Sequence, residues 1–196
     1  MARKILIGVA AVIVLLVLVI LTRPSTFHVE RSIMIAAPPQ NAFDQVNDFH
    51  AWSAWSPWDK LDPQMKRTYE GPPAGVGAKY AWTGNDQVGE GRMTIEKSER
   101  PSTIGIKLEF LKPFEATNTT TFTFAEAPQG AKVTWAMDGE NNFMAKAASL
   151  FMDMDKMIGA DFEKGLAALK SVAEAAPKAA PAPTALTAAP ANPAAP

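Results

Sequence analysis

The sequence contains no cysteine among its 196 residues. Disulfide bonds, thiolate metal sites, a cysteine nucleophile and a lipidated N-terminal cysteine are therefore excluded. Histidine is almost as scarce, since His28 and His50 are the only two. A zinc site or a Ser-His-Asp arrangement needs histidine together with partners that converge on one point. We expect no metal, no cofactor and no catalytic residue set in this protein.

The sequence also lacks an excess of positive charge. Its formal net charge is −1 and its pI is about 6.1, whereas a nucleic-acid-binding domain presents a basic face. Nucleic acid is therefore excluded as a partner. The stretch "WSAWSPWDK" needs another explanation, although it places three of the five tryptophans, Trp52, Trp55 and Trp58, at a spacing of three.

A long apolar run follows directly after Arg3 and Lys4. The segment "ILIGVAAVIVLLVLVIL", Ile5 to Leu21, would span roughly 25 Å as a helix, near the short end of what crosses a bilayer. A cleaved signal peptide is the alternative, but it has a shorter apolar core and a small-residue cleavage site, and here "TRPSTF" follows. We expect an uncleaved single-pass anchor in the cell membrane, with a cytoplasmic N-terminus and an extracytoplasmic (periplasmic) domain. Arg23 and Arg31 beyond the run weaken this assignment of sides.

The C-terminal end has the opposite character. From Ala175 the chain is almost only alanine and proline, which have little to bury and repeatedly interrupt a helix. We expect an extended tail, either solvated or serving as a spacer or a peptide that a partner binds. The predicted organisation is an anchor at 1–24, a folded domain at 25–174 and the tail at 175–196.

The folded domain is predicted to begin with a strand at 27–35, "FHVERSIMI", which is rich in β-branched residues. Pro38 and Pro39 open a short helix, and a second one holds His50 to Trp55. From residue 65 to residue 139, six strand-like runs are separated by segments with the Gly, Pro, Asn or Asp that turns require. Apolar and polar residues alternate along the runs, which predicts an antiparallel sheet with one apolar and one solvated face.

The last predicted element is one amphipathic helix, roughly Ala145 to Ala173, with apolar residues three or four positions apart. Asp153 and Asp155 would point about 200° apart on it, so they are not expected to share a metal ion. Strands and helices do not alternate as in a parallel α/β sheet. We therefore predict an α+β helix-grip fold, in which a curved seven-stranded antiparallel sheet surrounds the long C-terminal helix, preceded by a single N-terminal transmembrane helix.

This order of elements resembles one bacterial branch of the START/polyketide-cyclase (SRPBCC) superfamily. The phrases that carry the resemblance are "AWSAWSPWDKLDPQMKRTYEGP", "GVGAKYAWTGND", "VGEGRMTI" and "FMDMDKMIGADFEKGL". The resemblance covers nearly all of residues 27–172, and its motifs are specific for the family but weak for function. It implies a cavity between the sheet and the long helix that holds a lipid, sterol, polyketide or plant hormone. It transfers no catalytic residue.

The predicted function is binding of a lipid-like or other hydrophobic small molecule, with the membrane as a partner through Ile5 to Leu21. Because a curled sheet cannot close fully on one straight helix, we expect a gap of about 300–1,000 Å³ beside Trp135. Its mouth should lie near "LKPFE" and "ENNFMAK", where Phe114 and Phe143 act as covers. The expected ligand-binding residues are Trp55, Trp58, Trp82, Leu108, Phe122, Trp135, Phe143, Phe151, Met154 and Ile158.

Two other functions stay open. An enzyme of the cyclase, dehydratase or hydrolase type would need convergent polar groups, for which Asp48, His50, Glu70 and Asn118 are the candidates. A scaffold in an envelope complex would have a filled cavity and would use the tail as its contact.

The tryptophan stretch has three interpretations. Trp52 and Trp55 can close one end of the core, or Trp55 and Trp58 can form part of the pocket wall. A membrane belt is less favoured, because such belts flank the spanning segment itself.

Overall fold

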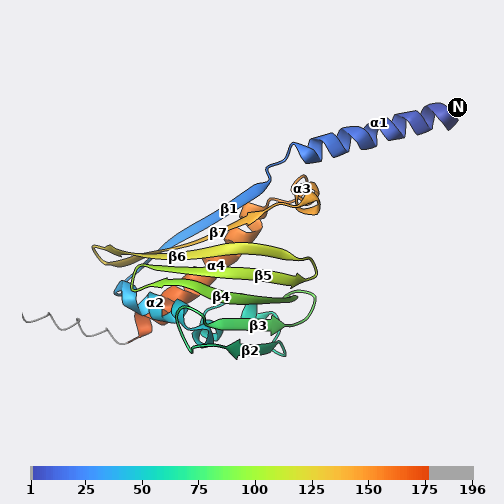
Figure 1. The fold of residues 1–196 in the computed structure, drawn as a ribbon. Helices are drawn as coiled ribbons and strands as arrows, with labels where there is room; N and C mark the ends of the chain where they lie inside the picture. Colours follow the sequence, from blue (N-terminus) through green and yellow to red (C-terminus); the bar gives the residue numbers. More distant parts are fainter. Residues whose placement is uncertain (1, 177–196) are drawn as a thin grey trace, which may run out of the picture.

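The computed structural model describes residues 2–176, so most of the predicted tail at 175–196 lies outside the described residues. Seven strands form one antiparallel sheet in the order β1-β7-β6-β5-β4-β3-β2 (Figure 1). The strands are β1 (Thr26–Ile35), β2 (Lys66–Glu70), β3 (Lys79–Thr83), β4 (Glu90–Glu99), β5 (Thr103–Lys112), β6 (Ala116–Ala127) and β7 (Gly130–Glu140). The predicted curved seven-stranded sheet is confirmed.

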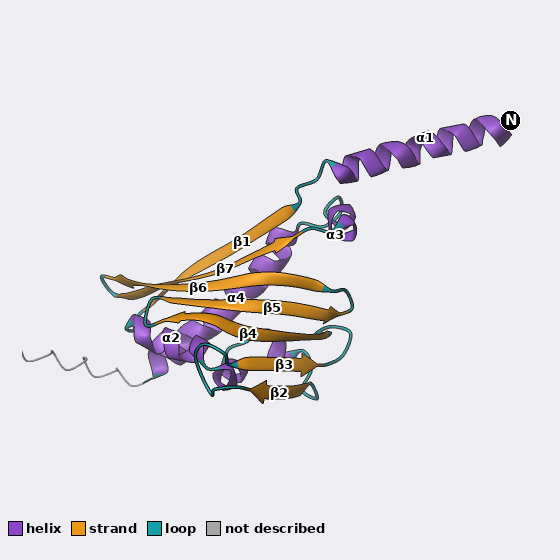
Figure 2. Cartoon of the chain, viewed as in Figure 1, coloured by secondary structure: helices purple, strands orange, loops and turns teal. Residues whose placement is uncertain are grey.

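Helices cover one face of this sheet, and one further helix lies at the N-terminus of the chain. They are α1 (Ala2–Leu21), α2 (Pro39–Asn47), the short 3-10 helices η1 (Phe49–Ala54) and η2 (Trp58–Lys60), α3 (Phe143–Ala148) and α4 (Met154–Ala175). Figure 2 shows α4 crossing the inner face of the sheet diagonally, while α1 extends away from the domain. The predicted α+β helix-grip architecture is confirmed in these elements.

The two faces of the sheet differ as the alternation predicts. Val133, Trp135 and Met137 of β7 are buried against the helices, and the residues between them face outward. On the outer face, Arg92 donates from Nε and Nη2 to the Glu109 carboxylate, both at 2.9 Å. Burial of the apolar inner face is the main stabilising contribution, while the outer face carries solvated ion pairs.

Arg31 of β1 ties α4 to the edge of the sheet. Its Nη2 donates to Asp155 Oδ2 at 2.9 Å, and its Nε donates to Glu163 Oε1 at 3.0 Å, so one guanidinium contacts α4 two turns apart. The helix passes over Arg31 at Gly159, where an added Cβ would lie 2.0 Å from Nη2. Gly159 therefore permits the close approach on which both ion pairs depend.

The prediction of one continuous helix from Ala145 to Ala173 is wrong in its first third. The chain forms the short α3, leaves helical structure after Ala148, and begins α4 only at Met154. Asp153 favours a new helix start after the break, because it accepts from the Lys156 N–H at 3.1 Å, as Asn142 accepts from the Ala145 N–H at 2.9 Å at the start of α3. Each of these bonds caps a helix N-terminus.

Gly159→Ala should lower the free energy of unfolding by about 1–3 kcal/mol, because the new methyl group must displace the Arg31 guanidinium from both carboxylates. Urea denaturation of the full chain in detergent measures the change. In an Arg31→Ala background the same substitution should be neutral or stabilising, since alanine is the better helix former by about 1 kcal/mol. An equal loss in both backgrounds would contradict this account of Gly159.

Candidate functional site

The middle of the sheet–helix layer is filled by aromatic rings. Phe162 of α4 stacks on Trp135 of β7, with ring centroids 4.1 Å apart and an interplanar angle of 9°. Trp55 and Trp58 place ring edges against Trp135 at 5.7 Å and 5.8 Å. Trp135 is 2 % exposed. The predicted gap beside Trp135 is therefore wrong, because Phe162 occupies the space.

Backbone contacts hold the tryptophan stretch in place. The indole N–H of Trp52 donates to the Val46 carbonyl at 3.0 Å, and that of Trp55 donates to the Gln45 carbonyl at 3.2 Å. Both acceptors belong to α2. A buried indole usually finds such a partner, and these bonds fix Trp52 and Trp55 as packing residues that close one end of the core.

Burial decreases along α4 toward its N-terminus. Phe162 and Leu166 are buried on the face that meets the sheet. Ile158 and Met154, one and two turns earlier on the same face, are only partly buried. The helix is thus closely packed in its C-terminal part and more open in its first turns.

The inner face of the sheet shows the same gradient along β5. Ile104 and Ile106 are buried, whereas Leu108 and Phe110, further along the same face, are partly exposed. Leu108 shares one cross-strand row with Asn118, Gly139 and Phe27, and Phe27 is also only partly buried.

Both gradients point to one end of the molecule. Arg31 binds Asp155 near the start of α4, while the Ala36 N–H donates to Glu174 near its end at 2.7 Å. The helix therefore runs in the same direction as β1, so its first turns lie toward the Phe27 row. We call this region the open end; its partly buried apolar side chains are Phe27, Leu108, Phe110, Met154 and Ile158.

One buried polar side chain lies at the open end. Asn118 of β6 is opposite both Leu108 and Gly139, and its amide has Met137 Sδ as a partner at 3.8 Å. Its Oδ1 lies over Gly139, where an added Cβ would be 2.2 Å away. Asn118 therefore offers an amide group in an otherwise apolar row, suited to orient the polar part of a mostly apolar molecule.

Sequence reasoning missed a second polar group on the inner face. Arg67 lies opposite Trp82 in the sheet and pairs with Asp59 at 3.2 Å, while its Nε is buried and has no hydrogen-bond partner among residues 2–176. Burial, together with the negative charge of Asp59, raises the pKa of Tyr80 to about 12, so its hydroxyl stays neutral at physiological pH. The alternation in "KRTYEG" could have revealed Arg67 as an inner-face residue, because Arg67 falls on the inward side of this strand.

The ten expected ligand-binding residues fall into three groups. Trp55, Trp82, Phe122 and Trp135 are buried in the core. Trp58, Leu108, Met154 and Ile158 are partly exposed, and all but Trp58 belong to the open end. Phe143 and Phe151 are exposed on the surface, and the placement of Phe151 against the sheet is wrong because the helix break removes it from α4.

A hollow of about 900 Å³ lies where the pairing of β6 with β7 ends. Its lining includes Glu115 and Asn142, which belong to the two segments expected to form the mouth. His28 and Asp138 lie 2.7 Å apart in it, and this contact raises the pKa of His28. None of the ten expected residues lines this hollow, whose lining mixes polar side chains such as His28 and Asp138 with the apolar Phe27.

Another hollow, about 220 Å³, brings together some of the residues named as candidates for an enzyme. His50 and Glu70 line it, His50 stacks on Tyr69 at 4.1 Å, and Asp48 Oδ1 lies 2.8 Å from His50 Nδ1. Asn118 lies elsewhere. The lining residues include no serine, threonine or cysteine that the Asp48–His50 pair could activate as a nucleophile. Within residues 2–176, no three metal-binding side chains converge on one point.

Comparison with known proteins gives a family and a fold. The profile of the family described as "Polyketide cyclase / dehydrase and lipid transport" matches residues 26–174. No curated protein matches the chain in sequence.

Three solved structures illustrate the shared fold. Protein CV1439 from Chromobacterium violaceum is 17% identical with a TM-score of 0.54, over 77% of this chain and 99% of that one. Protein MLL2253 from Mesorhizobium loti is 19% identical with a TM-score of 0.51, over 75% and 95%. The di-domain ARO/CYC BexL from the BE-7585A biosynthetic pathway is 17% identical with a TM-score of 0.57, over 82% and 54%. At these identities the likeness shows the fold.

Trp58 is the only one of the five tryptophans that is not buried, which predicts its spectroscopic behaviour. Acrylamide should quench the intrinsic fluorescence mainly through Trp58, so Trp58→Phe should remove most of the quenching. Trp135→Phe, the matched control, should leave the quenching constant of the remaining signal nearly unchanged. Quenching that depends on Trp135 instead would show that the middle of the layer is accessible.

Proposed function

We propose that this chain, which belongs to the polyketide cyclase/dehydrase and lipid transport family, is a membrane-anchored protein that binds a lipid-like molecule at its open end. The family and its fold provide a hydrophobic ligand-binding framework. The observation that carries the proposal is the loss of burial along both α4 and β5 toward the same end. Partly buried apolar side chains at one end of the layer leave surface that a hydrophobic ligand would remove from water.

The proposed site consists of apolar wall residues, buried aromatic rings beneath them and one polar group. Leu108, Met154 and Ile158 supply the wall, with Trp58 packed on Trp135 beside it. The buried rings of Trp55, Trp82, Phe122 and Trp135 support the site from within the core. Asn118 would hold the polar end of the ligand, because its amide has only a weak sulfur contact to give up.

Membrane anchoring through α1 is the second part of the proposal. The helix has 20 residues, and an 18-residue window of it has a mean hydropathy of 3.2. At about 1.5 Å per residue the helix measures about 30 Å, the thickness of a bilayer core. Its large apolar side chains other than Ile20 are exposed, as expected for lipid contact. Arg3 and Lys4 at its start favour a cytoplasmic N-terminus and an extracytoplasmic domain.

A scaffold that binds no ligand is the second candidate function. The stack of Phe162 on Trp135 supports it, because the middle of the sheet–helix layer is filled. In that case the open end would be part of a protein contact and would carry no small molecule. The two candidates differ in whether a lipid accompanies the purified protein.

Native mass spectrometry of the full chain, extracted from membranes in mild detergent, tests the proposal. The wild-type protein should carry a lipid-sized adduct, and Ile158→Glu should lose it, because a carboxylate at a partly buried wall position repels an acyl chain. Val172→Glu is the matched control, since Val172 is also partly buried on α4 but lies near the opposite end. It should keep the adduct.

Both variants retain the stacked core, so we expect each to lower the free energy of unfolding by about 1–2 kcal/mol and to remain folded. A wild-type protein that never carries a lipid, even after incubation with a phospholipid mixture, would favour the scaffold. Equal loss of the adduct in both variants would place the site elsewhere.

A further inference from the structure

A cluster of exposed apolar side chains lies on α3 and in the segment that leads to α4. It comprises Phe143 and Met144 of α3, Phe151 and Met152 after it, and Met157 in the first turn of α4. Phe151 is 88 % exposed and Met144 is 63 % exposed. We call this cluster the apolar tip. Large apolar side chains gathered on one surface mark an interaction site more often than single ones do.

Local hydrogen bonds give the apolar tip a defined shape. Asn142 caps the N-terminus of α3 and Asp153 caps that of α4, and Ser149 Oγ donates to the Lys146 carbonyl at 2.7 Å, at the end of α3. The break between α3 and α4 is therefore built by side chains that favour it. Its consequence is that Phe151 and Met152 point to solvent, whereas a continuous helix would have carried them elsewhere.

The apolar tip is held beside the end of α1. Asn141, the residue after β7, donates its backbone N–H to the Ser25 carbonyl at 2.8 Å and its side-chain amide to the Pro24 carbonyl at 3.2 Å. The linker from α1 is thus bound to the strand that leads directly into α3. Ile20, in the last turn of α1, is buried, and α1 and α3 lie in contact (Figure 1).

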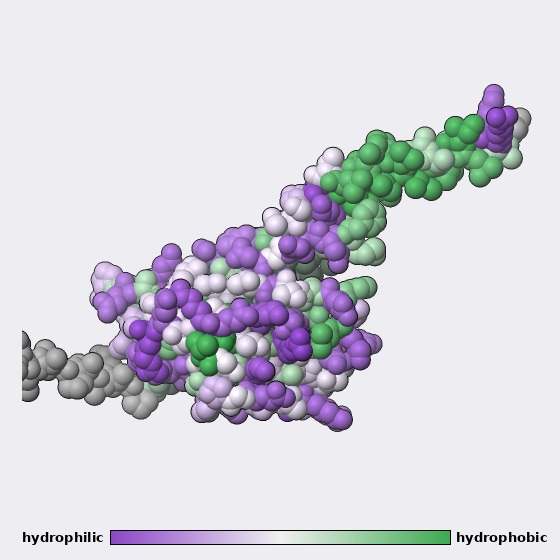
Figure 3. Space-filling view, in the orientation of Figure 1, coloured by the Kyte–Doolittle hydropathy of each residue, from purple (hydrophilic) through white to green (hydrophobic). Residues whose placement is uncertain are grey.

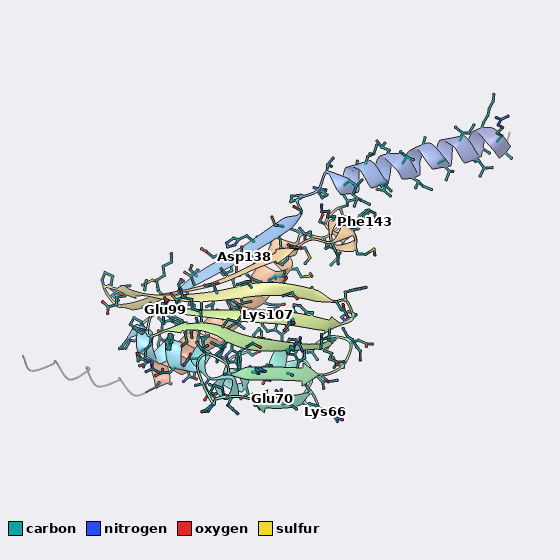
Figure 4. The ribbon with its side chains drawn as sticks, in the orientation of Figure 1. Lys66, Glu70, Glu99, Lys107, Asp138 and Phe143 are labelled. Atoms are coloured by element: carbon teal, nitrogen blue, oxygen red, sulfur yellow. The ribbon has the colours of Figure 1, made fainter. Side chains whose placement is uncertain are left out.

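The short linker limits how far the tip can lie from a bilayer. Four residues, Thr22 to Ser25, separate α1 from β1, and four extended residues reach at most about 14 Å. Figure 4 places Phe143 at the end of the sheet from which α1 extends, and Figure 3 shows apolar surface on that same end. A bilayer that holds α1 would therefore lie next to the apolar tip.

We infer that the apolar tip docks on the surface of the phospholipid bilayer that holds α1, with Phe151 and its neighbours inserted among the headgroups and upper acyl chains. This inference rests on the proposed anchoring. Phenylalanine and methionine suit such shallow insertion. The nearby charges are mixed, because Lys156 pairs with Asp153 at 3.1 Å, so docking should depend on apolar contact more than on anionic lipid.

Docking would also orient the proposed ligand site. Phe151 and Met152 lie just before Asp153, which caps α4, and Met154, the first residue of α4, is a member of the open end. With the tip in the bilayer, the open end faces the lipid surface. A hydrophobic molecule could then pass between the membrane and the domain without crossing bulk water, where its exposed apolar area would be unfavourable.

Single-cysteine labelling of the full chain tests this inference without background, because the chain has no cysteine of its own. Phe151→Cys and Met144→Cys are labelled with a small environment-sensitive fluorophore in phosphatidylcholine nanodiscs, and quenching by spin-labelled lipid is measured. Val76→Cys is the matched control: Val76 is 59 % exposed, but its loop between β2 and β3 lies at the opposite end of the sheet from α1 (Figure 1). Val12→Cys, within α1, reports on anchoring.

Labels at Phe151 and Met144 should show blue-shifted emission and severalfold stronger lipid quenching than the label at Val76. The difference should persist at high salt, which screens exposed charges but not apolar contacts. If Val12 is quenched while Phe151 and Met144 behave like Val76, the docking inference fails and the anchoring stands. If Val12 is not quenched either, the anchoring itself is refuted, and the docking inference falls with it.

Discussion

The stack of Phe162 on Trp135 is the contact on which the rest of the structure depends. It fixes α4 against the middle of the sheet, and Arg31 holds the same helix at the edge strand through Asp155 and Glu163. Because both contacts act near one edge of the sheet, α4 covers β1 and β7, while α2 lies against β5 and β6. The position of α4 therefore has two results: the middle of the sheet–helix layer is closely packed, and the layer is more open beside the first turns of α4.

With α4 in this position, the C-terminal part of the helix contributes mainly to stability, and its first turns belong to the proposed ligand site. The C-terminal part of the helix supplies buried apolar area, which dominates the free energy of folding. The first turns contribute less burial, and regions with few buried contacts are where opening costs least. The open end, the apolar tip and α1 lie at the same end of the domain, so ligand binding and membrane contact would act at one place.

Much of this could be predicted from the sequence, because alternation along strands and the spacing of apolar residues in helices follow directly from backbone geometry. The sheet and the inward orientation of Trp135 and Phe162 are of this kind. The helix break could not be predicted in that way, since apolar spacing continues through Leu150 and Phe151. Asp153 acts as a cap of α4 only once the Lys156 N–H is in place. The gap was placed wrongly because spacing shows which residues face each other and not how completely their rings fill the space.

The central claim is that a lipid-like molecule occupies the open end and not the middle of the layer. Photocrosslinking of the bilayer-reconstituted full chain with a phospholipid that carries a diazirine in its acyl chain, followed by peptide mapping, tests it most directly. Crosslinks within the domain should map to the first turns of α4, Met154 to Ile158, and to β5 around Leu108. Crosslinks confined to α1, or centred on the tryptophan stretch at 52–58, would contradict the account.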